Sequence, residues 1–475
     1  MLWGRFRAAL PLALALLAGC AQRPLQVHDG PVVFITLNSL RADVVGALGG
    51  ADPGLTPNLD RLMGSATWAG RAITPSSAVI PATAALLTGL RPWQNQVLGQ
   101  GRPDLSPDLL TLPEALKAVG YTTYGYYHGH WMERENGYGQ GFDSYELLGD
   151  GDDAIDLLSR LPPGRELVWA HVPEPQPPYV RRNWLLRRLK DLAPDLPPII
   201  RSPELARYAD PAVPLPPAER RRFRDLYRLH VAWADERLGR LLDALRRSGQ
   251  WDRTLLIVTS TYGEELGSGL GRERIEVPLA IKLPAGWRRP LAAARSERVA
   301  TLRLWATVVE AVGGPVPPAV APSLFARSRR PLPVLSELYS GDGANTFSLV
   351  DGDDQLLWES RFAPPEPEYY RALLENVPGA PPPEPPLRED GEAILGRLAT
   401  AFAATRPLSG TAPPLLSLVH WEGTSGSRRI DEPRRQAELA ARLARAWYRF
   451  VPEELSPDGE GQARKALPPP PARGH

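Results

Sequence analysis

The stretch Pro31-Val32-Val33-Phe34-Ile35-Thr36-Leu37-Asn38-Ser39 decides the fold class. An unbroken apolar and β-branched run such as Val32 to Leu37 is typical of a strand buried on both faces of a parallel sheet. The run Thr254 to Ser260 has the same character, and Glu166 to His171 and Tyr121 to Tyr127 are further strand candidates. These runs therefore predict a sheet whose central strands are buried on both faces.

Helical patterns alternate with these strands. Helix starts are predicted at Thr56–Met63 and at Pro81–Thr88, and a helix is predicted over 113–119. A long helix is predicted from about Ala218 to Arg247, where apolar residues recur at helical spacing. This alternation predicts an α/β fold with a mainly parallel sheet.

Composition limits the possible partners of the chain. Among 475 residues, 55 basic and 54 acidic side chains nearly balance, for a net charge of +1, so nothing indicates a nucleic-acid partner. The hydrophobic share of 43% is enough to fill a sizeable core. Cys20 is the one cysteine, which excludes an intramolecular disulfide.

The N-terminus has the layout of a signal peptide, with Arg5 and Arg7 before a short apolar run, Ala8 to Ala18. Leu17-Ala18-Gly19-Cys20 resembles the bacterial lipobox, which implies cleavage before Cys20 and lipids on its thiol and new amino group. The alternative is an ordinary signal peptide in which Cys20 is incidental. We expect a lipid-anchored protein of the bacterial cell envelope. Ala21 favours the outer membrane, with the protein facing the periplasm or the surface.

Five segments are expected along the chain. Residues 1–19 form the signal peptide, 20–30 a tether, 31–327 an α/β domain, 328–455 a smaller C-terminal α+β subdomain, and 456–475 a disordered tail. Within the subdomain, a β-hairpin is predicted around Asp351-Gly352-Asp353-Asp354, and an amphipathic helix over 434–450.

Several segments, in order over roughly residues 31–285, resemble the sulfatase family of the alkaline-phosphatase superfamily and its phosphoester- and phosphonate-cleaving relatives. The resemblance implies that family's sandwich fold around the central sheet, and a metal-dependent ester-cleaving site. The matching segments are the first strand with Leu40-Arg41-Ala42-Asp43, then Thr56-Pro57-Asn58-Leu59-Asp60-Arg61-Leu62, Leu86-Leu87-Thr88-Gly89-Leu90, Gly141-Phe142-Asp143-Ser144-Tyr145, Gly263-Glu264-Glu265-Leu266-Gly267 and Val277-Pro278-Leu279.

The resemblance places the family's metal ligands at positions that have lost their charge here. Asn38 and Ser39 stand where the first strand usually ends in Asp followed by Asp or Thr, and Thr261 and Tyr262 stand in place of Asp followed by His or Asn. Hard divalent cations prefer carboxylate oxygens. We therefore expect no cofactor, and a calcium-like cation only if the site has been rebuilt.

The family's nucleophile position, two residues before Pro81, is Val79, which has no oxygen or sulfur. The basic or imidazole position two residues after that proline is Thr83. Ser76 and Ser77 are the possible substitutes, if the chain is shifted by one turn.

The imidazole of the family's Asp-Pro-His-x-Pro-Tyr segment corresponds to Gln176 here. His128 and His130 lie where true sulfatases carry Gly-Lys-Trp, and with His171 they are the histidines expected near the cleft. These three histidines are interpreted as ordinary strand-end or loop residues, or alternatively as parts of a relocated site. Aromatic residues that could line a carbohydrate-like ligand are Tyr126, Tyr127, Trp131, Tyr179 and Tyr262.

Three functions stay open on these observations. The first is a catalytically inactive sulfatase-like protein that binds a ligand, such as a sulfated or phosphorylated carbohydrate, or that acts in envelope assembly. The second is an active hydrolase or transferase of sulfuric or phosphoric esters, with a rebuilt site around Asn38, Ser76 or Ser77, His128 and His130. The third is a structural envelope protein without a ligand.

Overall fold

The computed structural model describes residues 26–360 and parts of 415–439. Gaps in the first range are residues 53, 100–103, 149–152, 188, 190–191, 193–194, 201–215, 265–268, 328–332 and 340–344; beyond it, residues 415–423, 426–430, 432, 435 and 439 are described.

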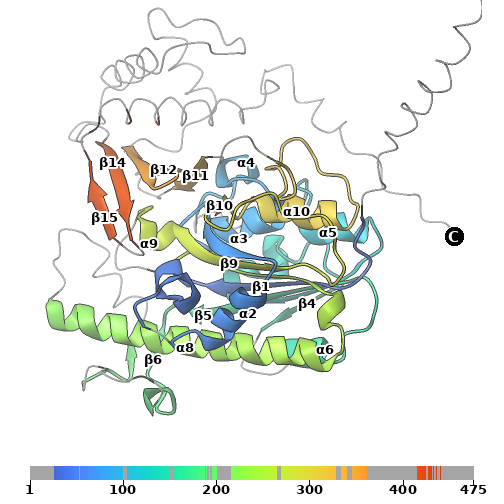
Figure 1. Cartoon of the computed structure of the whole chain (residues 1–475), viewed down its shortest axis with the longest axis horizontal. Helices are drawn as coiled ribbons and strands as arrows, with labels where there is room; N and C mark the ends of the chain where they lie inside the picture. Colours follow the sequence, from blue (N-terminus) through green and yellow to red (C-terminus); the bar gives the residue numbers. More distant parts are fainter. Residues whose placement is uncertain are drawn as a thin grey trace, which may run out of the picture.

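An eight-stranded sheet forms the centre of the molecule, in the order β10-β2-β9-β8-β1-β5-β3-β4 (Figure 1). Only β9 runs against the other strands, since β8 and β2 both pair with it in antiparallel fashion. The predicted mainly parallel sheet is confirmed. Its strands are β1 (Val32–Asn38), β2 (Trp68–Ile73), β3 (Thr122–Tyr127), β4 (Ser144–Leu147), β5 (Glu166–Pro175), β8 (Leu255–Ser260), β9 (Glu276–Lys282) and β10 (Val299–Ala300).

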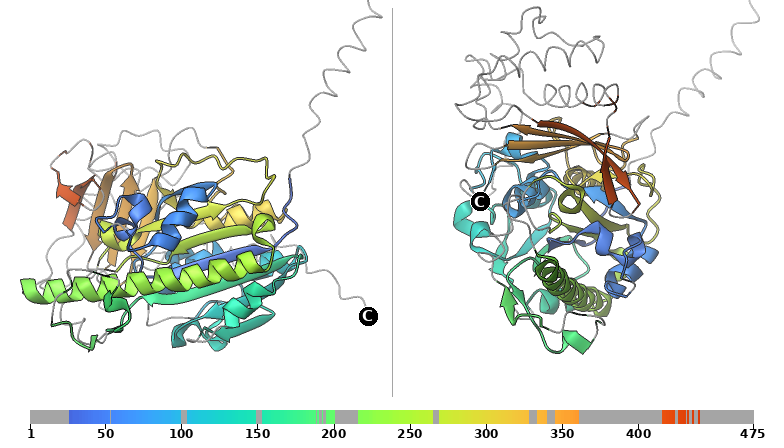
Figure 2. Two further views of the ribbon diagram at one scale, coloured as in Figure 1. Left: turned by 60° about the horizontal axis from the view of Figure 1, so that its bottom comes forward. Right: turned by 90° about the vertical axis from the view of Figure 1, so that its left-hand side faces the viewer.

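Two helical layers cover the sheet, as expected for the sandwich. The side chains of α3 (Val79–Thr88), α5 (Leu112–Lys117) and α10 (Arg303–Ala311) share one core cluster with Val32 and Phe34. Those of α2 (Pro57–Ser65), α6 (Asp153–Ser159) and α8 (Pro217–Arg247) share the other with Val33 and Ile35. Alternate residues of β1 thus enter opposite cores. Figure 2 (right) shows α8 end-on below the sheet.

The predicted helices are present with shifted ends. The long helix begins at Pro217, one residue before the prediction, and ends at Arg247 as predicted. Helix α3 begins at Val79 rather than at Pro81, because a proline is tolerated anywhere in the first turn, where backbone N–H groups lack helical acceptors.

A second sheet of five antiparallel strands follows, in the order β11-β12-β13-β14-β15. The predicted hairpin is confirmed: Asp351 pairs with Asp354, and Gly352 in the turn has φ +65°. The predicted helix over 434–450 and tail over 456–475 lie outside the described residues, except for Arg435 and Leu439. The strands are β11 (Val334–Leu338), β12 (Asn345–Asp351), β13 (Asp354–Ser360), β14 (Leu415–Glu422) and β15 (Gly426–Arg429).

Short elements complete the described chain. They are η1 (Ala42–Val44), η2 (Gly46–Leu48), α4 (Pro92–Asn95), η3 (His130–Met132), η4 (Arg134–Asn136), β6 (Tyr179–Val180), η5 (Leu185–Arg187), β7 (Ile199–Ile200), η6 (Trp251–Arg253) and α9 (Arg272–Ile275).

The folded body starts earlier than the predicted tether allows. Gln26 accepts a hydrogen bond from the Arg288 N–H at 2.7 Å, and the His28 N–H donates to the Ala311 carbonyl at 2.7 Å. His28 is buried. Residues 26–30 therefore belong to the body rather than to the tether. Cys20 and the predicted signal peptide lie outside the described residues, and within the described ones no helix has the length and apolar character needed to cross a membrane.

Candidate functional site

The candidate site lies at the carboxyl ends of three neighbouring parallel strands. Asn38 ends β1, Thr261 follows β8, and Gln176 follows β5. Leu37 pairs with Ser260 on one side and with Val172 on the other, so the three strand ends meet at one edge of the sheet. In open α/β sheets this edge is the usual place for ligands. The structure thus brings together three residues that the sequence assigned to the site.

A chain of neutral hydrogen bonds joins these three side chains. The Thr261 hydroxyl donates to Oδ1 of Asn38 at 2.8 Å, and the Asn38 amide nitrogen donates to Oε1 of Gln176. Asn38 and Thr261 are almost completely buried. Both ends of the Asn38 amide are therefore used within the protein, and the buried polar groups satisfy one another without a charge.

The loop after β1 is held by its backbone. Ser39 has φ +73°, an uncommon value for a residue other than glycine. Its carbonyl oxygen accepts hydrogen bonds from the Tyr227 hydroxyl at 2.9 Å and from the Glu264 N–H at 3.2 Å. The Ser260 hydroxyl accepts one from the Leu40 N–H at 2.9 Å. Hydrogen bonds from α8 and from the loop after β8 therefore fix this turn.

Tyr262 occupies the last of the four metal-ligand positions as a buried phenol. Its hydroxyl donates to the Glu264 carboxylate at 3.3 Å. Burial, aided by the negative charge of Glu264, raises the pKa of the phenol, so it stays neutral. The Arg274 guanidinium lies 5.8 Å from the ring centre and donates to the Ser77 carbonyl at 3.1 Å. Arg274 is thus a cation beside the site that the sequence analysis missed.

The divalent cation of the family does not fit these residues. Asn38 Oδ1, the one amide oxygen at the four ligand positions, already accepts the Thr261 proton. Within the described part of the chain, no three His, Cys, Asp or Glu side chains converge as a metal would require. Glu174, the first residue of the segment that contains Gln176, is buried, and its carboxylate accepts hydrogen bonds from Arg237 at 3.1 and 3.2 Å. Burial raises the pKa of the Glu174 carboxyl despite this partner.

The position that the sequence analysis assigned to the nucleophile, Val79, carries no reactive group. Val79 is the first residue of α3, and Thr83 is buried one turn further on. The Ser77 hydroxyl donates to the Gly269 carbonyl at 2.7 Å, which gives it a structural role. The Ser76 hydroxyl is buried and has no hydrogen-bond partner among the described atoms. Neither serine is bonded to a base that could activate it.

The histidines do not assemble the rebuilt site. The His130 side chain is 96% exposed and lies 3.0 Å from the Glu133 carboxylate, away from the buried network. His128 Nδ1 lies 3.4 Å from the Leu148 carbonyl. His171 lies within β5, not at a strand end or in a loop as predicted, and its Nδ1 is 2.9 Å from the Thr36 hydroxyl. Burial, with a smaller contribution from His128, lowers the pKa of His171 to about 3, so its ring is neutral.

Most of the predicted aromatic lining is core. Tyr126, Tyr179 and Tyr262 are buried and cannot stack on a ligand. Tyr127 is partly exposed, but its ring is stacked on Tyr145 with centroids 4.5 Å apart. Trp131, 44% exposed, is the predicted aromatic side chain that is open to solvent.

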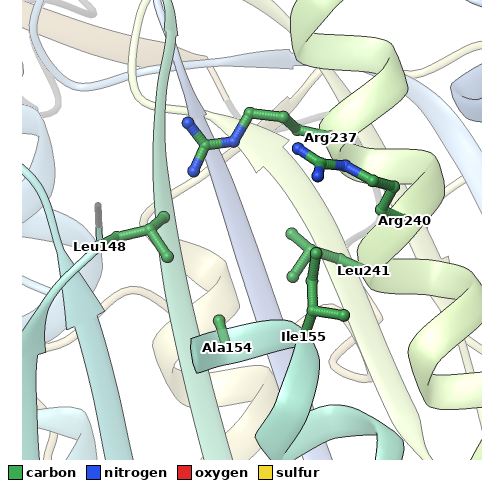
Figure 3. A pocket seen from close by; sticks show the side chains of 6 residues that line it. All are labelled: Leu148, Ala154, Ile155, Arg237, Arg240 and Leu241. Carbon is green, nitrogen blue, oxygen red and sulfur yellow. The ribbon is translucent and has the colours of Figure 1, made fainter. Parts of the chain in front are cut away.

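A small cavity lies between α6 and α8, beside the buried Glu174–Arg237 pair (Figure 3). Two arginines and four apolar side chains line it: Leu148, Ala154, Ile155, Arg237, Arg240 and Leu241. Its volume of about 10 Å³ matches the space of a single water molecule. The cavity is therefore too small for an organic ligand.

These features define a sulfatase-like α/β sandwich with uncharged side chains at positions 38, 39, 261 and 262. The Sulfatase family model matches residues 31–156 and 183–314, which is more than half of the chain. The chain belongs to the sulfatase family.

The curated relatives match in part. A multifunctional alkaline phosphatase superfamily protein of Trinickia caryophylli is 34% identical over 108 residues, 21% of each chain. A sulfatase of Formosa agariphila is 23% identical over 308 residues, 51% of this chain and 60% of the relative. An N-acetylgalactosamine-6-O-sulfatase of Bacteroides thetaiotaomicron is 33% identical over 126 residues, 24% of each. The chain thus spans at most 60% of the length of these relatives.

Solved structures support the fold. A phosphonate monoester hydrolase of Agrobacterium radiobacter aligns with a TM-score of 0.55 at 17% identity, over 81% of this chain and 99% of that one. A 2-O GAG sulfatase aligns with a TM-score of 0.56 at 15% identity, over 86% and 96%. At such identities the likeness shows the fold alone.

Proposed function

We propose that this chain is a catalytically inactive member of the sulfatase family, held in the cell envelope by a lipid on Cys20, whose cleft serves binding or envelope assembly. The neutral hydrogen-bond chain Thr261–Asn38–Gln176 carries this proposal. A divalent cation would need carboxylates where an amide and a hydroxyl now bond to each other. Without a cation, no nucleophile is activated, and Val79 at the nucleophile position has no atom that could attack an ester.

The ligand class rests on the relatives. Those named as sulfatases, one of them for N-acetylgalactosamine-6-O-sulfate esters, favour a sulfated or phosphorylated carbohydrate as the ligand of the cleft. Arg274, which reaches the Ser77 carbonyl and the Tyr262 ring, is a cation beside the candidate site that would attract an anion. Exposed Trp131 offers a face for a sugar ring.

The test is the metal content of the mature protein after dialysis against calcium, magnesium, manganese and zinc, together with turnover of sulfate, phosphate and phosphonate esters. We expect less than about a tenth of an equivalent of metal and no saturable cleavage. The Asn38→Asp/Thr261→Asp variant places two carboxylates at the strand ends and should gain cation binding. Ser106→Asp, which adds a carboxylate at an exposed position, is the matched control and should gain none.

About one equivalent of tightly held metal in the wild-type protein, with ester cleavage, would overturn the inactive assignment. The rebuilt-site hydrolase would then take its place, and Ser76, whose hydroxyl has no described partner, would be the first residue to mutate. Mass spectrometry of the membrane-extracted protein tests the anchor separately. An N-terminus at Cys20 with attached acyl chains supports it, and cleavage at another residue refutes it.

A further inference from the structure

The described chain begins at the sheet edge opposite the candidate site. Residues 30 and 31 precede β1, Arg165 precedes β5 and Arg253 precedes the start of β8, while antiparallel β9 ends there at Lys282. Asn38 lies at the other end of β1, seven residues later, which is about 20 Å away. In Figure 2 (left) the first described residues, in dark blue, lie at the end of the molecule away from the orange and red C-terminal sheet.

Basic side chains surround this point. Arg165, Arg253, Lys282 and Arg288, which we call the exit surface, flank the segment in which Gln26 and His28 enter the fold. Arg288 lies next to Gln26 because its N–H donates to the Gln26 side chain. Three strand ends and the loop after β9 therefore bring together residues that are far apart in the sequence.

The hydrogen bonds of the exit surface leave its charge in place. Arg165 donates to the Val119 carbonyl at 3.0 Å, and Arg253 to the Pro163 carbonyl at 3.4 Å. Lys282 donates to the carbonyls of Trp251 and Thr254 at 2.6 and 3.3 Å. A carbonyl acceptor orients a cation but does not neutralise it, unlike the carboxylate that pairs with Arg237 on the site side.

Acidic groups are fewer at this edge. Asp29 and Asp252 are exposed there, and the Glu166 carboxyl is largely buried, which raises its pKa. Burial lowers the pKa of Lys282 to about 8, which still leaves most of the amine charged at neutral pH. The edge is therefore net positive. Val27, 48% exposed, adds an apolar side chain at the same place.

We propose that the exit surface faces the membrane and contacts anionic phospholipid headgroups, so that the candidate site points away from the bilayer. This inference rests on the proposed anchor. Residues 21–25 separate Cys20 from Gln26, and even when this segment is fully extended the two residues are at most about 22 Å apart. A tether this short holds the body close to the bilayer, where basic side chains are attracted to anionic lipid headgroups.

The experiment places one fluorophore on the acylated protein in vesicles that carry a headgroup quencher. Acylation consumes the Cys20 thiol, so a thiol dye reports only an introduced cysteine. Ala285→Cys labels the exit side, and His130→Cys labels the site side, both at exposed positions. With phosphatidylglycerol present, we expect the dye at 285 to lose most of its fluorescence and the dye at 130 to keep it. Equal quenching at the two positions would overturn the inference.

A charge variant tests the lipid contact itself. Arg165→Gln/Arg253→Gln, in the 285-labelled protein, should abolish the extra quenching that phosphatidylglycerol produces over phosphatidylcholine alone. Arg429→Gln, on exposed β15, should leave that quenching unchanged. Equal thermal midpoints would show that all variants are folded. If Arg429→Gln also lost the extra quenching, the assignment of the exit surface would be overturned.

The outcomes separate the anchor from the surface. An acylated chain with equal quenching at both labels keeps the anchor and refutes the surface. A chain without acyl groups that still sediments with anionic vesicles, and no longer does so as the double variant, refutes the anchor and supports the surface.

Discussion

At the scale of single residues, this protein stabilises its strand ends by pairing buried polar groups. Asn38 bonds to Thr261 and Gln176, and the Asp235 carboxylate on α8 accepts the N–H groups of Asn58 and Leu59 at 3.0 and 2.8 Å. The second contact caps the first turn of α2, where backbone donors lack helical partners. The Pro-Asn-Leu-Asp segment of the sequence is thus explained by a helix cap rather than by chemistry.

Removing that cap should be costly. Asp235→Ala leaves the two buried N–H groups and the Asn58 amide without their charged acceptor, so we expect a loss of roughly 2–4 kcal/mol in the free energy of unfolding. Urea denaturation measures it. Asp243→Ala, an exposed carboxylate on the same helix, should change it by no more than about 0.5 kcal/mol. Equal effects would refute the capping role.

Buried His171 should make stability depend on pH. Its pKa is about 3 in the folded protein and about 6.5 when unfolded, so its stability contribution is complete above pH 6.5 and is lost as the pH falls towards 3. His230, lowered to about 4 by burial, acts in the same direction. When the pH is lowered from 6.5 to 5, the free energy of unfolding of His171→Gln should fall by about 2 kcal/mol less than that of the wild-type protein. Urea unfolding at the two pH values measures this difference. Exposed His130→Gln should behave as wild type.

At the scale of elements, the C-terminal sheet is joined to the central one through a charged cluster. Glu276, the first residue of β9, bonds to Arg71, Arg272 and Arg298 at 2.6, 3.0 and 2.6 Å. Trp421 of β14 contacts the guanidiniums of Arg272 and Arg298, each 5.0 Å from its ring centre. The indole covers the cluster from water, which strengthens both its cation–π contacts and the ion pairs.

Trp421→Ala should therefore loosen the second sheet. We expect a loss of about 3–5 kcal/mol, because a 3% exposed indole leaves a cavity beside charged groups. Denaturation followed by both fluorescence and circular dichroism is the measurement, since separate transitions would show the sheets uncoupling. Trp184→Ala, at a 41% exposed position, is the control and should change stability little. An unchanged Trp421 variant would contradict the docking role.

At the scale of the whole molecule, ester cleavage would require different side chains at several strand ends and on α3 at the same time. The position expected for the nucleophile lies on α3, those expected for the metal ligands lie at the ends of β1 and β8, and that expected for the imidazole follows β5. Each is replaced by a neutral or unreactive side chain, and three of the replacements bond to one another. The fold is therefore retained without the side chains that ester cleavage would need.

Val79→Ser alone should accordingly not produce ester-cleaving activity. The new hydroxyl would have neither a cation nor a bonded base to activate it, so cleavage of 4-nitrophenyl sulfate and phosphate should stay at background. The comparison is with Val79→Ala, and thermal melting checks that both variants fold. Saturable turnover by the serine variant would contradict the proposed inactivity.

The sequence alone determined four strands of the main sheet, β1, β3, β5 and β8, and its long helix. Uniform apolar runs such as Val32 to Leu37 have one stable environment, a strand between two helical layers, and the α8 pattern extends over 31 residues. Strands β2, β4, β9 and β10 were not predicted. Gly70 and Arg71 interrupt the apolar run of β2, Pro278 interrupts that of β9, and β4 and β10 have only four and two residues. The ordered motifs also indicated the family and the altered positions.

Tertiary structure alone decided what those altered positions do. No local pattern shows that Thr261 donates to Asn38 across 223 residues, or that Arg237 bonds to Glu174, since both contacts arise when distant strand and helix ends meet. Burial likewise separated His171 from exposed His130, although the sequence placed both among the histidines expected near the cleft. The spacing of apolar residues along a chain reveals its periodicity and therefore predicts helices and strands. The burial, protonation and hydrogen-bond partners of a side chain depend on neighbours that only the folded chain supplies.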